Sequence, residues 1–122
     1  MEQTLTIDKK QVTFRKSGAT MLAYKRQTGR EFLSDLSEFL NCVNRDKKGK
    51  IIMKGAIPGV DMAKFDIEYM YQMLYVMAKS ADKTIPADIL DWLDSFDEFD
   101  VIGTFVKLLP MLSAEMAVDE KN

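Results

Sequence analysis

The feature that most constrains the fold is a nearly continuous apolar stretch over residues 67–78, in which only Glu68 and Gln72 are polar. A helix that is apolar on almost every face is normally the buried centre of its domain, because no side of it is suited to water. We therefore predict a central helix over residues 62–80, with Asp61 as its N-cap and the other elements packed around it.

The N-terminal residues alternate between apolar and polar side chains. Leu5 and Ile7 are separated by one residue, and Val12 and Phe14 repeat the pattern after a polar turn. Alternation with a period of two places these side chains on one face of a β-hairpin over about residues 4–15. Because an isolated hairpin is only marginally stable in water, this face is expected to pack on helices.

Further helices are predicted where apolar residues recur at steps of three and four. Two capping-box patterns mark expected helix starts, Thr28 with Glu31 and Ser95 with Glu98. With the central helix, the chain is expected to contain four to five helices. The additional predicted helices cover about residues 18–27, 30–44, 86–95 and 97–116.

The predicted fold class is α+β and mainly α, with the N-terminal hairpin packed on the helices in a single domain of residues 1–122. An irregular loop or flap is expected at residues 45–60. Gly55, Pro58 and Gly59 break any helix there, while short apolar runs give the segment weak strand character.

The composition is that of a globular protein. Hydrophobic residues make up 47% of the 122 residues and charged residues 30%, which argues against disorder. The single cysteine cannot form an internal disulfide, and no apolar stretch reaches the roughly 20 residues that a membrane helix needs. The first residues show no secretion signal. We therefore expect a cytoplasmic protein without a membrane partner.

Catalytic residue patterns are scarce. The chain has no histidine, which removes the commonest general base and metal ligand near neutral pH. Cys42 lies on the apolar side of its predicted helix, so a buried structural role is favoured over a nucleophilic one. Phosphate-loop, dinucleotide and nucleophile-elbow motifs are absent from the sequence. We expect neither enzymatic activity nor a cofactor or bound metal.

An acidic run near the C-terminal end has three interpretations. Carboxylates at steps of three could share a helix face and bind a hard cation, but the glycine and ligand spacing of a calcium loop are missing. Acidic residues also favour helix N-termini, which gives a solvated acidic face. The third interpretation is a docking surface for a basic partner. The residues concerned are Asp88, Asp91, Asp94, Asp97, Glu98 and Asp100.

The spacing of helices on either side of Thr28 is compatible with a helix-turn-helix, and Lys25, Arg26 and Arg30 lie nearby. This pattern keeps a small DNA-binding or regulator-binding protein as an alternative function. The negative overall charge and the scatter of basic residues argue against it, so no nucleic-acid partner is expected.

Methionines and aromatic residues provide the candidate binding surface. Nine methionines in the chain is a high number, and methionine serves both to fill irregular cores and to form adaptable binding surfaces. Core packing is the simpler explanation for most of them. Some of this apolar surface is nevertheless expected to remain for a partner. The candidate partner-binding residues are Met70, Met73, Met77, Trp92, Phe96 and Phe99.

Charge is distributed unevenly along the chain. Residues 1–60 carry 12 Lys/Arg and 6 Asp/Glu, a balance of +6, whereas residues 61–122 carry 5 and 13, a balance of −8. Such asymmetry can direct association with a partner or with a second copy of the chain. Two solvated faces are the alternative explanation.

Several short strings are spread over most of residues 4–112. They are Leu5-Thr6-Ile7-Asp8, Thr20-Met21-Leu22-Ala23-Tyr24-Lys25-Arg26-Gln27-Thr28-Gly29-Arg30-Glu31-Phe32, Met77-Ala78-Lys79-Ser80-Ala81-Asp82-Lys83-Thr84-Ile85-Pro86 and Trp92-Leu93-Asp94-Ser95-Phe96-Asp97. With these strings the chain resembles the tail assembly chaperones of siphophages and prophages of Gram-positive bacteria. Residues 45–60 have no counterpart in that resemblance.

The resemblance implies a non-enzymatic function in phage tail assembly. Proteins of this group coat the long, helical tape-measure protein and keep it soluble while tube subunits assemble around it. A translational frameshift commonly gives a longer form whose added part contacts the tail tube protein. The resemblance therefore implies the tape-measure protein as partner, action in the cytoplasm of a bacterial host cell, and a homo-oligomer. It carries over no catalytic residue.

Overall fold

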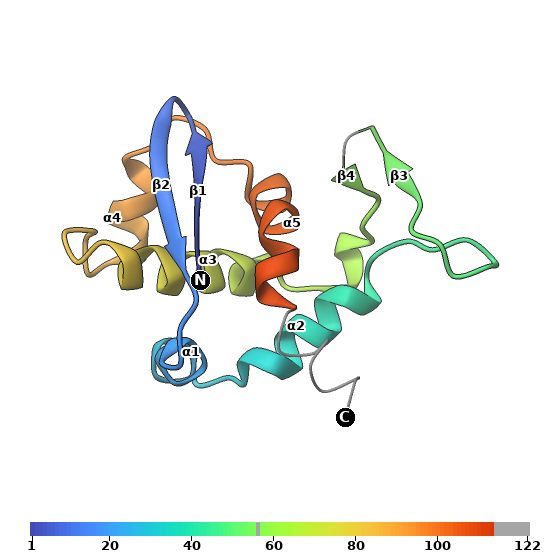
Figure 1. The fold of residues 1–122 in the computed structure, drawn as a ribbon, viewed down its shortest axis with the longest axis horizontal. Helices are drawn as coiled ribbons and strands as arrows, with labels where there is room; N and C mark the ends of the chain where they lie inside the picture. The colour runs from blue at the N-terminus through green and yellow to red at the C-terminus, as the bar shows by residue number, and fades with distance from the viewer. Residues whose placement is uncertain (56, 114–122) are drawn as a thin grey trace.

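The computed structural model describes residues 1–55 and 57–113 and has the α+β, mainly α fold that the sequence predicts (Figure 1). The N-terminal hairpin and the helices share one hydrophobic core. In chain order the elements are β1 (Glu2–Ile7), β2 (Lys10–Arg15), α1 (Thr20–Thr28), α2 (Phe32–Asn41), β3 (Met53–Lys54), β4 (Ile57–Pro58), the 3-10 helix η1 (Met62–Lys64), α3 (Ile67–Ala81), α4 (Ile89–Asp94) and α5 (Val101–Leu112).

Strands β1 and β2 form the predicted antiparallel hairpin, with Leu5 opposite Val12. Asp8 and Lys9 form its two-residue turn, and their φ angles of 50° and 66° are those of a turn whose twist suits a hairpin. Val12 and Phe14 are buried, and Phe14 has no exposed surface. The alternating pattern therefore predicts the buried face of the hairpin, which packs against α3.

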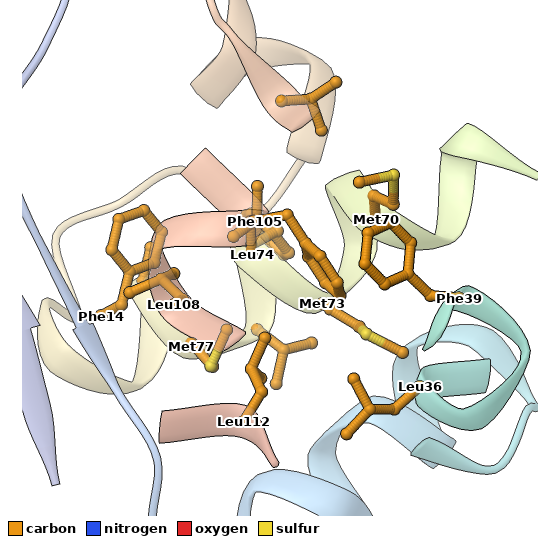
Figure 2. Close-up of a cluster of buried hydrophobic side chains, with 14 of the residues drawn as sticks. Phe14, Leu36, Phe39, Met70, Met73, Leu74, Met77, Phe105, Leu108 and Leu112 are labelled. Carbon is orange, nitrogen blue, oxygen red and sulfur yellow. The ribbon is translucent and has the colours of Figure 1, made fainter. Parts of the chain in front are cut away.

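Helix α3 passes through the middle of the molecule, and Figure 2 shows the core packed around it. Its six consecutive residues from Met73 to Ala78 are buried, as expected for a helix that is apolar nearly all round. Helix α5 contributes the same number of buried residues as α3, seven, in a shorter length of 12 residues against 15. The core is thus built by two central helices rather than by α3 alone.

The first predicted capping box is wrong. Thr28 is the last residue of α1, and its hydroxyl donates to the Tyr24 carbonyl at 2.8 Å and accepts from the Arg30 amide at 3.0 Å. Gly29, with a φ of 75°, ends the helix in the left-handed conformation that glycine adopts at low cost. Helix α2 then starts after Glu31, whose side chain makes no capping hydrogen bond.

The second predicted capping box is wrong for a similar reason. Ser95 ends α4, and its hydroxyl donates to the Trp92 carbonyl at 2.6 Å instead of capping a new helix. The N-cap of α5 is Asp100, whose carboxylate accepts from the Gly103 amide at 3.0 Å. The pattern gives the helix break correctly, but the carboxylate that caps α5 lies five residues later.

The predicted central helix begins later than expected. Asp61 does cap a helix, but it is the short η1, where it accepts from the Ala63 amide at 3.2 Å. Phe65 has an extended backbone and interrupts the predicted helix. Asp66 then caps α3 by accepting from the Glu68 amide at 3.0 Å. Two aspartates five residues apart thus start two successive helices.

The last helix is predicted to reach about residue 116, whereas α5 ends at Leu112 with Ser113 as its C-cap. Residues 114–116 lie outside the part of the chain that the structure describes. Across the described ranges, no helix has both the length and the apolar character needed to span a membrane. The longest of them, α3, has 15 residues.

Candidate partner-binding surfaces

The three methionines predicted to bind a partner lie inside the molecule. Met70, Met73 and Met77 have no exposed surface. Figure 2 shows them among side chains from the neighbouring helices, including Leu36 and Phe39. Because this core encloses them, they cannot line an open groove in this conformation. The adaptability of methionine is used here to fill the space between helices.

The three predicted aromatic residues are brought together, but mostly below the surface. The rings of Trp92, Phe96 and Phe99 lie 5.3–5.7 Å apart in pairs, all edge to face. Tyr71 and Tyr75 of α3 extend the cluster through contacts with Phe99 and Trp92. Trp92 and Phe96 are buried and Phe99 is half-buried. The cluster fixes α4 and the loop after it against α3.

Helix α1 exposes apolar side chains that the candidate set omitted. Only Thr20 and Tyr24 of this helix are buried, while Leu22 is 55% exposed and Met21 is also exposed. Residues two positions apart in a helix are separated by about 200° around its axis, so Leu22 points away from the buried Tyr24. This spacing is visible in the sequence and could have identified the exposed face.

A groove of about 360 Å³ lies between α1 and the C-terminal half of α3. It continues into a shallow hollow of about 400 Å³ along the face of α1 that carries Leu22. Small apolar side chains form the floor, and Arg26, Lys79 and Lys83 place positive charge at the edges. We call this surface the α1 groove. Its lining residues are Ala19, Leu22, Ala23, Arg26, Gln27, Tyr75, Val76, Lys79, Ser80, Lys83 and Ala87.

The wall of the α1 groove on the α3 side is held by hydrogen bonds to the loop that precedes α4. The Tyr75 hydroxyl donates to the Pro86 carbonyl at 2.6 Å, and burial raises the pKa of this phenol. The Lys79 ammonium donates to the carbonyls of Ile85 and Lys83. These contacts keep a cation at the edge of the groove in a fixed position.

A buried polar cluster fixes α1 on its other side. Asp35 accepts a 2.6 Å hydrogen bond from the Tyr24 hydroxyl and paired hydrogen bonds from the Arg30 guanidinium, the shortest at 2.6 Å. Arg30 also lies over the Tyr69 ring, 4.1 Å from its centre. Burial opposes ionisation of Asp35, but the hydrogen bonds from Arg30 and Tyr24 outweigh it and lower its pKa. Burial and the bond to Asp35 raise the pKa of Tyr24.

The predicted flap, residues 45–60, has the weak strand character that the sequence indicates, since its described residues include the short strands β3 and β4. Its centre is a ring of backbone hydrogen bonds at 2.8 Å that joins Asn44, Ile52 and Gly59. Strands β3 and β4 pair beyond this ring. An isolated bridge between Val43 and Val60 joins the two ends of the flap at its base. A β-carbon on Gly59 would lie 3.0 Å from the end of the Asn44 side chain and 3.4 Å from the Ile52 carbonyl, so these segments are closely packed at the glycine.

The turn of residues 46–50 presents the basic side chains of the flap. One carboxylate oxygen of Asp46 accepts from the amides of Lys48 and Lys50 at 2.8 and 2.9 Å. Gly49 supplies the positive φ that closes the turn, and Arg45 donates to the Gly49 carbonyl. The flap carries five Lys/Arg and one Asp between residues 45 and 54, a balance of +4.

Three consecutive apolar residues of the flap, Ile51, Ile52 and Met53, are exposed beside these cations. In the part of the chain that the structure describes, none of the four flap lysines forms an ion pair. The flap is therefore a basic surface with an apolar centre. Figure 1 shows that it projects from the body of the molecule at the end opposite α4.

The acidic run forms a surface on α4 and the loop that follows. Residues 88–100 contain six Asp/Glu and no Lys/Arg, and all six acidic residues are exposed. Leu90, 66% exposed, lies among them. We call this surface the acidic face. Across residues 1–55 and 57–113, no group of three or more His, Cys, Asp or Glu side chains is placed to hold a metal ion.

Cys42 is buried at the end of α2, as predicted, and its thiol donates to the Glu38 carbonyl at 3.2 Å. Burial raises the pKa of this thiol, which favours the unreactive protonated form. The helix-turn-helix interpretation places α2 as the second helix. Its ten residues include Asp35 and Glu38 but no Lys or Arg, so its surface is poorly suited to DNA phosphates.

The described surface therefore carries three features suited to macromolecular partners: the α1 groove, the flap and the acidic face. The first two combine apolar side chains with positive charge, and the third combines an apolar side chain with negative charge. Comparisons of the chain with protein-family models, with curated proteins and with solved structures found no match.

Proposed function

We propose that this protein is a non-enzymatic phage tail assembly chaperone that binds the tape-measure protein in the α1 groove and keeps it soluble during tail assembly. The proposal is supported by the sequence strings that resemble this group and by one structural observation. That observation is that α1, a helix packed on the core, turns Leu22 outward beside a groove with a positively charged edge.

The α1 groove has the chemistry that an amphipathic helix requires. A client helix would place its apolar residues on Leu22, Ala23 and Val76 and its acidic residues near Arg26 and Lys83. Three alanines, Ala19, Ala23 and Ala87, line the groove and set few specific demands on a client side chain, so it selects a pattern rather than a particular sequence. A long tape-measure helix repeats that pattern over many turns.

Weak binding by each copy is an advantage on such a client. Burying a leucine side chain contributes only about 1.5–3 kcal/mol, so one groove binds one helical segment weakly. Many copies along one client together give strong retention, and each can still be displaced when tube subunits arrive. We propose that the chaperone acts in the bacterial host cytoplasm as a homo-oligomer, and that a frameshifted longer form contacts the tail tube protein.

The proposal is tested by co-expression with a phage tape-measure protein. We expect the chaperone to raise the soluble yield of the tape-measure protein and to be recovered with it in a pull-down. Equal yield and solubility of the tape-measure protein with and without the chain would remove the proposed function.

A pair of variants localises the contact. Leu22→Gln places a polar side chain in the α1 groove, and Ile67→Gln makes the same change at an exposed isoleucine outside it. Both sites are exposed, so both variants should fold with stabilities within about 0.5 kcal/mol of wild type. Recovery of the client should fall at least several-fold for the Leu22 variant alone. Equal loss in both variants would rule out the α1 groove as the specific site.

A further inference from the structure

We propose that the flap of one copy docks on the acidic face of a second copy, which gives a head-to-tail contact between identical chains. The inference goes beyond the α1 groove and does not require the client. It rests on two surfaces of opposite charge on the same molecule, the flap with three exposed apolar side chains and the acidic face with one.

The flap is built to present its charge in a fixed arrangement. The carboxylate of Asp46 closes the turn by accepting two backbone hydrogen bonds. The backbone that carries Lys47, Lys48 and Lys50 is therefore held in place. The ring of hydrogen bonds at Asn44, Ile52 and Gly59 holds the rest of the flap. A preordered surface loses less conformational entropy on binding than a mobile loop would.

The acidic face is similarly fixed. The amide of Asp97 donates to the Asp8 carboxylate at 2.8 Å, and Lys10 donates to the Ser95 carbonyl, so the turn of the N-terminal hairpin holds the loop after α4. Lys10 also lies over the Phe96 ring, 5.2 Å from its centre. The carboxylates of Asp91 and Asp94 project from this anchored element.

The apolar side chains match as well as the charges. Leu90 is surrounded by acidic residues on one surface, and Ile51, Ile52 and Met53 adjoin basic residues on the other. Docking would bury these side chains together and pair the charges around them, the arrangement of an apolar centre and a polar rim that protein interfaces use. A nucleic acid on the flap would pair with the lysines but would leave Leu90 exposed.

The positions of the two surfaces determine the kind of assembly. They lie at opposite ends of the longest axis of the molecule (Figure 1), so the flap cannot reach the acidic face of its own chain. A contact between different surfaces of identical chains leaves one of each surface free at the ends. Each added copy therefore creates a site for the next, and the contact produces an open row instead of a closed dimer.

Charge reversal on the purified protein alone tests this contact. One variant carries Lys47→Glu, Lys48→Glu and Lys50→Glu in the flap, which changes the flap balance from +4 to −2. The other carries Asp91→Lys, Asp94→Lys, Asp97→Lys and Glu98→Lys in the acidic face, which changes its balance from −6 to +2 and keeps the helix caps Asp88 and Asp100. Mass is measured by light scattering over a range of concentrations at about 50 and 500 mM salt. The average mass of the wild-type protein should rise with concentration at low salt, and its association constant should fall at least about tenfold at high salt.

Each reversed variant alone should stay monomeric, because its flap and its acidic face then carry the same sign. An equimolar mixture should associate again, since each reversed surface meets a complementary one on the other variant. A control with the same net charge change as the flap variant, Arg15→Glu, Lys25→Glu and Lys107→Glu, alters exposed residues outside both surfaces and should associate like wild type.

Several results would overturn the inference. They are a monomeric wild type at low salt, association that survives either reversal, or a mixture that stays monomeric although both variants are folded by circular dichroism. Association that disappears after nuclease treatment would instead identify a nucleic acid as the ligand of the flap. Because no tape-measure protein is present, failure here leaves the proposed binding of the client in the α1 groove untouched, although a monomeric wild type would also remove the proposed homo-oligomer.

Discussion

The two antiparallel hairpins within residues 1–55 and 57–113 differ in how they contact the core. In the N-terminal hairpin, strands of six residues alternate apolar and polar side chains and bury Val12 and Phe14 against α3. In the flap, the strands have only two residues each, and an apolar run from Ile51 to Met53 leads into β3 and stays exposed. Both are held by backbone hydrogen bonds, yet the apolar run of the flap, unlike Phe14, adds no buried side chain to the core.

The difference shows that the arrangement of apolar residues matters more than their number. Side chains in a strand point alternately to its two faces, so a run of three apolar residues cannot lie on one side. A two-stranded ribbon with apolar residues on both faces must expose some of them unless other elements cover both sides. Exposure in the flap is therefore expected from the sequence order, and it marks a surface available to a partner.

The largest expected effect comes from removing the side chain that joins the first hairpin to the core. Phe14→Ala should destabilise the protein by about 3–5 kcal/mol, because the residue is fully buried and a cavity would remain. The matched change in the flap, Ile52→Ala, should stay within about 0.5 kcal/mol, because that side chain is exposed. Urea denaturation measures both, and similar losses in the two variants would break the contrast between the hairpins.

A second contrast concerns two acidic partners of Arg30, the buried Asp35 and the exposed Glu38. The Asp35 side chain is 2% exposed, whereas its partner Arg30 is 40% exposed. Asp35→Asn should cost about 2–3 kcal/mol, below the range for a fully buried pair, because water screens the guanidinium. Glu38→Gln removes an exposed partner of the same arginine and should cost less than about 0.5 kcal/mol. Equal losses would place the Asp35 cluster among ordinary surface pairs.

The Asp35 cluster also predicts a direction for the effect of pH. The folded protein lowers the pKa of Asp35, so it binds this proton less tightly than the unfolded chain, and protonation favours unfolding. The contribution of Asp35 is complete above the unfolded pKa near 4 and is lost as pH falls through the lower folded pKa. The difference in unfolding free energy between wild type and Asp35→Asn should be constant from about pH 7 to 5 and shrink toward pH 2. A difference that grows as the solution is acidified would contradict this assignment.

The sequence predicts the body of the molecule better than its surfaces. Periodicity finds the N-terminal hairpin and the helices, because burial imposes the period on the residues that form the core. Both capping boxes fail, since a threonine or serine hydroxyl can equally bond to a carbonyl of the preceding turn, as Thr28 and Ser95 do. Local patterns of this kind do not state on which side of a residue the helix lies.

The candidate binding residues illustrate a different limit. Met70 is buried in a core that it shares with side chains of distant elements such as Phe39 of α2, and this packing is not encoded in the spacing of residues within α3. Leu22 is exposed because it lies opposite the buried Tyr24 on α1, a relation that the spacing does contain. Which of two apolar surfaces is covered depends on elements far away in the chain. For a helix with one side known to be buried, as Tyr24 defines for α1, the sequence does predict which residues lie on the opposite, exposed side.

The smallest expected effect is confined to the flap, and it tests whether this segment is a rigid element. Asp46→Ala removes the acceptor for the amides of Lys48 and Lys50. Global stability should change by less than about 1 kcal/mol, because the turn lies outside the core. Amide exchange at Lys48 and Lys50 should accelerate by up to about tenfold, because the turn opens more often without its side-chain acceptor. The amides of α3 should exchange as in wild type.

Asp46→Asn provides the control, because it removes the same charge but keeps a side-chain oxygen able to accept both hydrogen bonds. Its amide exchange should stay close to that of wild type, which separates the effect of the turn from the effect of charge. If the flap docks as proposed, the alanine variant should also associate less strongly than the asparagine variant, although both carry the same set of lysines. Unchanged exchange in the alanine variant would mean that the backbone ring at Asn44, Ile52 and Gly59 alone orders the flap. The turn of residues 46–50 would then contribute only its positive charge to docking, and the arrangement of its lysines would not select one acidic partner over another.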